Sequence, residues 1–167
     1  RAPPPQRAPP ASKGSDKTAR AELDEHCTVL SKLFGGLEDV LVLFSKRGRR
    51  SVLAGEAGVR ADVEGLIRRD LNDERLGQIL AIADGMLEAV WVRSGSSAAL
   101  EMVQRAEDGA ARPPDLSEQV ERRARFDAAL AAAASGGHRL PCRALPQSPG
   151  AAEAAAREAA RASREAA

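Results

Sequence analysis

A stripe of apolar residues between Leu23 and Phe44 constrains the fold of this chain more than any other feature. The spacing alternates between four and three residues, which places every member on one side of an α-helix. The basic residues after Phe44 suit the end of such a helix, where cations interact favourably with the helix dipole. The pattern predicts one long helix whose apolar side carries Leu23, Cys27, Leu30, Phe34, Leu37, Leu41 and Phe44.

Two shorter helices are expected next. Gly55 and Gly58 mark a loop, after which Val59, Val63, Leu66 and Ile67 form a second helical stripe. Asn72 is a suitable N-cap for a third helix, because its side chain can accept a hydrogen bond from a free backbone N–H group. The buried side of that third helix is predicted to consist of Leu76, Ile79, Leu80 and Ala83.

The hydrophobic period changes after Gly85. Residues 86–93 are rich in β-branched and aromatic side chains, residues 94–97 (Ser-Gly-Ser-Ser) favour a turn, and residues 100–104 are apolar again. This pattern predicts a β-hairpin, with Trp91 in the core. A fourth main helix is expected after Asp115, on a stripe that includes Leu116, Val120, Phe126 and Leu130.

Helices followed by a hairpin are the order of a winged helix. We therefore expect a mainly α fold with a small β-hairpin, which is a winged-helix-like domain with an added long N-terminal helix. Its length of 167 residues allows one domain with tails. We assign residues 1–20 to a disordered Pro-rich segment, 21–149 to the domain, and 150–167 to a solvated helical tail rich in Ala, Glu and Arg.

Several functional classes find no support in the residues. The formal net charge is only +1, so nucleic-acid binding would need local basic clusters. His26, Cys27, His138 and Cys142 are zinc-ligand types, but they lack the paired spacing of a zinc site. We find no acid, base or nucleophile constellation, and expect no catalytic residues, no metal and no cofactor. No apolar run approaches the roughly 20 residues that span a bilayer, so no membrane partner is expected.

Four stretches occur in a recognisable order. They are Leu23-Asp24-Glu25-His26-Cys27-Thr28-Val29-Leu30 running to Leu33-Phe34-Gly35-Gly36-Leu37-Glu38; Arg68-Arg69-Asp70-Leu71 with Leu76-Gly77-Gln78-Ile79; Arg122 to Phe126, leading to Leu130; and Leu140-Pro141 with Ala144-Leu145-Pro146-Gln147-Ser148-Pro149. Together they resemble the geminin-binding winged-helix domain of the DNA replication licensing factors of the Cdt family. The resemblance covers residues 23–149.

The resemblance implies a nuclear role in the cell cycle. Factors of this family help to load the minichromosome maintenance (MCM) helicase at origins, together with the origin recognition complex. By resemblance, this domain docks regulators and assists loading, and binds DNA weakly and without sequence preference. Residues 24–27 stand where the family has Pro and Tyr, so geminin or a geminin-like inhibitor stays an open partner.

Two sets of residues are the candidate sites. The partner-binding candidates lie on the first helix and are Leu23, Cys27, Leu30 and Phe34. The stripe is also compatible with a purely structural role in the core. The DNA-binding candidates are Arg68, Arg69, Arg75, Gln78, Arg122 and Arg123. Arginine contacts phosphate and base edges, although the same charges also suit an ordinary solvated surface.

Other functions remain open at this point. A winged-helix DNA-binding transcription regulator is the alternative, and a small all-α enzyme is a third possibility. Ser148-Pro149 matches the minimal pattern of a proline-directed phosphorylation site, and Arg143-Ala144-Leu145 matches a minimal cyclin-docking pattern. Both patterns are short enough to occur by chance.

Overall fold

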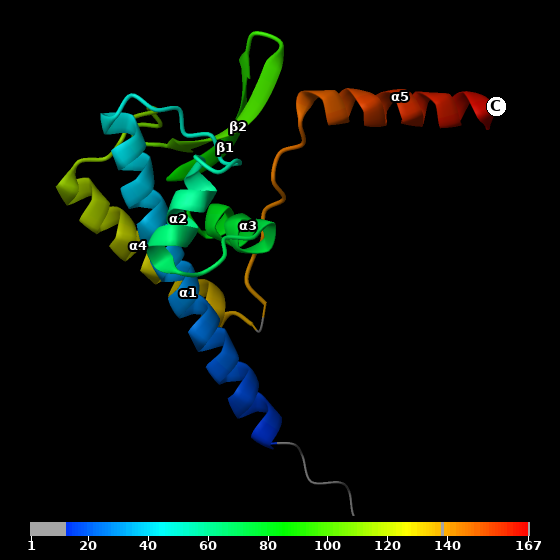
Figure 1. The fold of residues 1–167 in the computed structure, drawn as a ribbon. Coiled ribbons are helices and arrows are strands. Elements are labelled where there is room, and N and C mark those ends of the chain that lie inside the picture. The colour runs from blue at the N-terminus through cyan, green and yellow to red at the C-terminus, as the bar shows by residue number, and fades with distance from the viewer. Residues whose placement is uncertain (1–12, 138, 167) are drawn as a thin grey trace, which may run out of the picture.

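Helix α1 (Lys13–Lys46) is the longest element of the molecule and lies between α2 and α4 (Figure 1). The computed structural model describes residues 13–137 and 139–166. Over these residues the chain is mainly helical, with one two-stranded antiparallel hairpin after the third helix. The predicted fold class is therefore confirmed.

The start of α1 differs from our expectation of disorder over residues 1–20. Residues 1–12 lie outside the described part of the chain, but residues 13–20 are helical. This segment contains Lys, Ala and Arg, which favour helix, and has no proline. Adding turns to an existing helix costs far less than nucleating a new one. The side chains of residues 14–20 are exposed, so this end of α1 projects beyond the core.

Helices α2 (Val59–Ile67) and α3 (Asp73–Ile82) are separated by a short turn. Arg68 adopts a left-handed backbone conformation with φ 61°, which ends α2. The Asn72 side chain accepts a hydrogen bond from the backbone N–H of Arg75 at 2.8 Å, as expected for an N-cap. Leu66 was placed on the apolar stripe of α2, but its side chain is exposed.

The hairpin consists of β1 (Leu87–Ser94) and β2 (Ser97–Gln104). Its register runs from Leu87 opposite Gln104 to Ser94 opposite Ser97, so β2 begins earlier than predicted. A two-residue turn closes the hairpin, and Gly95 supplies the positive φ that such turns require. A β-bridge joins Val52, which precedes α2, to Glu101 of β2. The order of the helices, this bridge and the hairpin is that of a winged helix.

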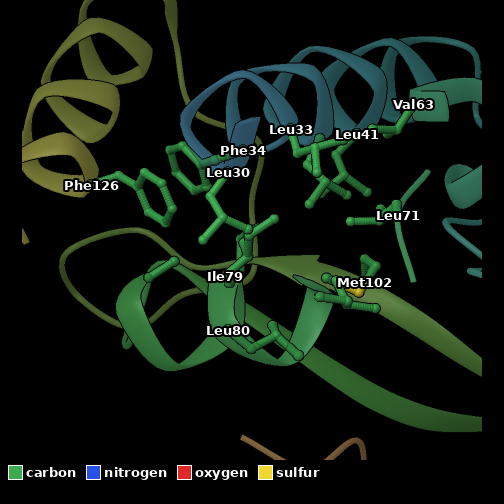
Figure 2. Close-up of a cluster of buried hydrophobic side chains, with 14 of the residues drawn as sticks. Leu30, Leu33, Phe34, Leu41, Val63, Leu71, Ile79, Leu80, Met102 and Phe126 are labelled. Atoms are coloured by element: carbon green, nitrogen blue, oxygen red, sulfur yellow. The ribbon is translucent and has the colours of Figure 1, made fainter. Parts of the chain in front are cut away.

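The core lies where α1, α3 and the hairpin meet (Figure 2). Leu30, Leu33 and Phe34 of α1 face Ile79 and other apolar residues of α3. The largest fully buried side chains are Phe34, Phe44, Phe126, Leu30, Leu33, Leu37, Leu71, Leu76, Ile79, Leu80, Leu87 and Met102. Burying a side chain of this size stabilises the fold by roughly 1.5–3 kcal/mol relative to exposure. Leucine and phenylalanine therefore build the core despite the low aromatic content.

Helix α4 (Leu116–Ser135) packs along α1 in the opposite direction. The Phe34 and Phe126 rings are stacked, with centroids 4.1 Å apart. Asp115 and Glu118 form a capping box, in which each side chain accepts a hydrogen bond from the backbone N–H of the other residue. This box fixes the first turn of α4, and the aromatic stack fixes its middle against α1.

An extended segment follows α4 and crosses the outer side of α3. We call residues 139–148 the strap. The backbone N–H of Arg143 donates to the Gly77 carbonyl at 2.9 Å, and the Trp91 indole N–H donates to the Pro146 carbonyl at 2.8 Å. Trp91 is half-buried beneath the strap and lies outside the core cluster. The prediction that Trp91 belongs to the core is therefore wrong. The strap leads into α5 (Pro149–Glu165), in which no described residue is buried and which stands away from the other helices (Figure 1).

Candidate partner-docking groove

An open groove lies between the N-terminal half of α1 and the C-terminal half of α4. Its volume is about 470 Å³. The apolar part of its wall comes from Cys27 on α1 and from Leu130, Ala131 and Ala134 on α4. The polar residues that line it are Arg20, Asp24, Thr28, Ser31, Lys32 and Asp127. An apolar centre with a charged border is the usual composition of a protein-binding surface.

The groove exists because the two helices carry side chains of different size along their contact. Phe34 and Phe126 fill the space between the helices near the core. Closer to the free end of α1, the facing residues of α4 include Ala131 and Ala134, whose small side chains leave the space open. The Ser31 hydroxyl donates to the Asp127 carboxylate at 2.6 Å and ties the helices together at the inner end of the groove.

Cys27 contributes an uncharged surface to the groove. Its side chain is partly buried, and burial raises the pKa of the thiol, as does the nearby Asp24 carboxylate to a smaller extent. Because only the thiolate is strongly nucleophilic, a raised pKa makes Cys27 a poor nucleophile near neutral pH. The thiol therefore behaves here as a small apolar group.

The structure divides the four predicted partner-binding residues into two pairs. Leu23 and Cys27 are half-exposed and pack against the edge of the core, so a partner can reach them. Leu30 and Phe34 are completely buried between α1, α3 and α4, and the prediction that they contact a partner is wrong. The same stripe thus changes from core to accessible surface where α1 projects past α3.

Two of the predicted DNA-binding residues are structural. Arg122 is buried and forms a bidentate ion pair with Glu38 of α1, with N–O distances of 2.6 and 2.9 Å. Gln78 is buried in α3, and its Oε1 lies 2.7 Å from Nε2 of His26. Neither side chain can reach a nucleic acid, so both predictions are wrong.

The remaining four predicted DNA-binding residues are arginines, and they differ in whether their guanidinium groups already form an ion pair. Arg75 is paired with Asp70 at 2.9 Å, and Arg123 is paired with Asp39 at 2.5 Å. Arg68 and Arg69 are exposed, and within the described residues neither forms an ion pair. Only this adjacent pair is therefore free to contact phosphate.

The outer side of α3 is not open for insertion into a DNA groove. The strap lies against it so closely that a Cβ atom on Gly77 would stand 2.5 Å from the Arg143 carbonyl oxygen and 2.7 Å from the Cys142 sulfur. The solvent-facing residues at the start of α3 are Asp73 and Glu74, which repel phosphate. In winged helices that read DNA directly, the corresponding helix must be accessible and carry donors for base edges.

The α4 side of the groove could not be predicted from the sequence. Ala131 and Ala134 belong to an alanine-rich run that looks like ordinary helix-forming sequence. These alanines matter because they lie opposite Cys27 of α1, where their small side chains leave the groove open. Neither hydrophobic periodicity nor charge marks such positions.

Among residues 13–137 and 139–166, no group of three or more His, Cys, Asp or Glu side chains is placed to hold a metal ion. Within the same residues no helix is both long and apolar enough to cross a membrane. No family model matches the chain, and no curated protein matches it either.

Proposed function

We propose that this domain is a non-catalytic docking module of a nuclear DNA replication licensing factor, which binds regulators and assists loading of the MCM helicase at origins. The observation that carries the proposal is the groove between α1 and α4. Its apolar centre is surrounded by charges of both signs, which suits a helical segment of a partner protein. The order of the four stretches that resemble the licensing factors supports the choice of partners.

The charges at the border of the groove indicate what kind of partner segment fits. Asp24 and Asp127 are acidic, whereas Arg20 and Lys32 are basic. A partner helix with an apolar stripe and both signs of charge beside it would match this border. Such charges set orientation and association rate more than affinity. Helicase subunits, the origin recognition complex and a geminin-like inhibitor are the proposed sources of the segment.

A winged-helix transcription regulator is the alternative function, and the strap counts against it. Direct reading of base edges would require the strap to leave α3, which costs the contacts of Leu140 with the core as well as the Arg143 to Gly77 hydrogen bond. Of the predicted DNA-binding residues, Arg68 and Arg69 are therefore the two expected to contact DNA, and this contact has no base specificity.

Titration of DNA binding against salt distinguishes the two functions. Neutralising about two phosphates gives a slope near −1.8 in a plot of log affinity against log salt, so affinity should fall roughly tenfold between 50 and 200 mM salt. Replacing Arg68 and Arg69 together by Ala should remove most of this slope. The matched control replaces the exposed Arg157 and Arg164 of α5, which changes the net charge equally. Tight binding to one sequence in excess competitor DNA would contradict the licensing proposal and favour the regulator.

A further inference from the structure

The hairpin has one long edge that is paired and one that is not. On the paired edge, β2 contacts the segment before α2, where the Leu53 N–H donates to the Leu100 carbonyl and the Met102 N–H donates to the Ser51 carbonyl. In the part of the chain that the structure describes, β1 pairs with β2 alone. The hairpin also projects beyond the helices α1 to α4 (Figure 1), and residues 93–98 at its tip are exposed. A free edge of this kind is a surface on which another strand can pair.

The strand pairing shows which backbone groups of β1 lie on the free edge. In an antiparallel pair, opposite residues direct their N–H and C=O groups either toward each other or both outward. Leu100 and Met102 direct theirs outward, so their partners Trp91 and Ala89 also point outward. Alternation along the strand adds Arg93 to this set. Among the described residues, these three residues of β1 form no backbone hydrogen bond outside the hairpin.

β1 lacks the features that usually protect such an edge. Natural proteins block exposed edges with devices such as proline, lysine or a β-bulge. Residues 87–94 contain neither proline nor lysine, and the ladder runs from Leu87 to Ser94 without a bulge. The strap lies against the Trp91 side chain, and no backbone hydrogen bond joins the strap to β1. The outer edge of β1 is therefore regular enough to pair with another strand.

We propose that β1 pairs antiparallel with β1 of a second copy of this chain, which joins the two hairpins into one sheet. The two-fold axis passes between Trp91 of one copy and Trp91 of the other. Ala89 of each copy then lies opposite Arg93 of the other. All the outward N–H and C=O groups of these three residues find partners in this register, because outward-facing residues meet outward-facing residues.

The neighbouring registers satisfy fewer backbone groups. A shift by two residues in one direction puts Arg93 opposite Leu87, whose N–H already donates to the end of α3. A shift in the other direction puts Ala89 opposite Gly95, which lies in the turn with a positive φ. A shift by one residue would turn every side chain to the wrong face of the sheet. The register centred on Trp91 is therefore the one that uses the whole free edge.

Self-pairing in this register also covers apolar surface, which favours a second copy over an unrelated strand. Val90 and Val92 lie on the face of β1 opposite Trp91, and both are only half-buried. In the pair, Val90 of each copy lies opposite Val92 of the other, so the valines of both copies form one cluster. Cross-strand pairs of β-branched side chains stabilise a sheet, and no charged residue of β1 comes opposite a like charge.

The pairing is independent of the docking function. The groove residues lie on α1 and α4 and take no part in it. A failure of either proposal would leave the other unaffected.

The first test is amide hydrogen exchange of the full chain, followed by NMR at about 1 mM and about 50 µM protein. The amides of Ala89, Trp91 and Arg93 should be protected at the higher concentration, and dilution toward the monomer should reduce this protection. The amides of Val90 and Val92 already bond to β2 and serve as the reference. Fast exchange of the three edge amides at the higher concentration would overturn the proposal.

The second test is sedimentation equilibrium of wild type, R93P and R93A. Proline at position 93 removes an outward N–H and leaves the bonds to β2 intact, whereas alanine removes the side chain alone. Wild type and R93A should form dimers, and R93P should raise the dimer dissociation constant at least about tenfold. Circular dichroism and Trp91 fluorescence verify that both variants fold. A monomeric wild type, or equal dimerisation of R93P and R93A, would overturn the pairing.

Discussion

The guanidinium group of Arg122 and the carboxylate of Glu38 form a bidentate ion pair in the interior of the molecule. Arg122 Nε lies 2.6 Å from Glu38 Oε2, and Nη2 lies 2.9 Å from Oε1. The same guanidinium group donates to the backbone carbonyls of Arg105 and Met86. The Arg122 side chain of α4 therefore connects α1 to the residue before β1 and to the residue after β2.

Removing Arg122 should destabilise the fold strongly. R122A leaves the completely buried Glu38 carboxylate without its counter-ion, which costs about 3–5 kcal/mol of unfolding free energy. Urea unfolding followed by circular dichroism measures this loss. The double replacement R122M/E38L removes both charges and should recover a large part of it. A loss below about 1 kcal/mol in R122A would show that this pair does not hold the elements together.

The close contact between Gly77 and the strap predicts opposite effects for two helical glycines. A Cβ atom at Gly77 meets the Arg143 carbonyl, so G77A should displace the strap and cost about 1–3 kcal/mol. Gly65 of α2 has open space around it, so G65A should stabilise the protein by up to about 1 kcal/mol. Trp91 is the single tryptophan of the chain and is bound to the strap, so its fluorescence reports the displacement. Unchanged fluorescence in G77A would contradict the proposed packing.

The capping box of α4 predicts a dependence of stability on pH. Hydrogen bonds from Arg112 and from the Asp115 backbone lower the pKa of Glu118 from 4.5 to about 2. A lowered folded-state pKa means that Glu118 stabilises the fold above pH 4.5, and that this contribution is lost as the pH falls toward 2. The difference in urea midpoint between wild type and E118Q should therefore shrink over that range. E121Q, which changes an exposed neighbour that has no ion pair among the described residues, should show no such trend.

The sequence predicted the elements of the fold well because their apolar periods are strong. The stripe on α1, the Asn72 cap and the change of period after Gly85 each depend on short-range rules. Hydrophobic periodicity does not determine which residues of a stripe become buried against another element of the fold. Leu66, Leu116 and Val120 lie at helical spacing, but the structure leaves all three exposed. Burial depends on which helix packs where, and that is decided by long-range contacts.

The candidate site was predicted only in part, for a similar reason. Arg122 and Arg123 look alike as neighbouring basic residues, yet the helix turn directs one into the core and leaves the other partly exposed. Cys27 was identified from its place on the stripe, whereas Ala131 opposite it was not. A groove is a property of two facing helices, and neither helix alone reveals it.

The groove between α1 and α4 is tested most directly by affinity capture with the full-length protein, from extracts of dividing cells that are licensing origins. Three proteins are compared: wild type, A131R and A128R. Ala131 lines the groove and Ala128 does not, although both are exposed on α4, so the two arginines should be equally tolerated by the fold.

Mass spectrometry then measures the captured helicase, origin-complex and inhibitor subunits against the wild-type level. We expect wild type and A128R to capture them equally, and A131R to lose them, because its side chain fills the groove. Equal capture by all three proteins would contradict the groove as the docking site, and capture of none of these subunits by wild type would contradict the licensing role itself.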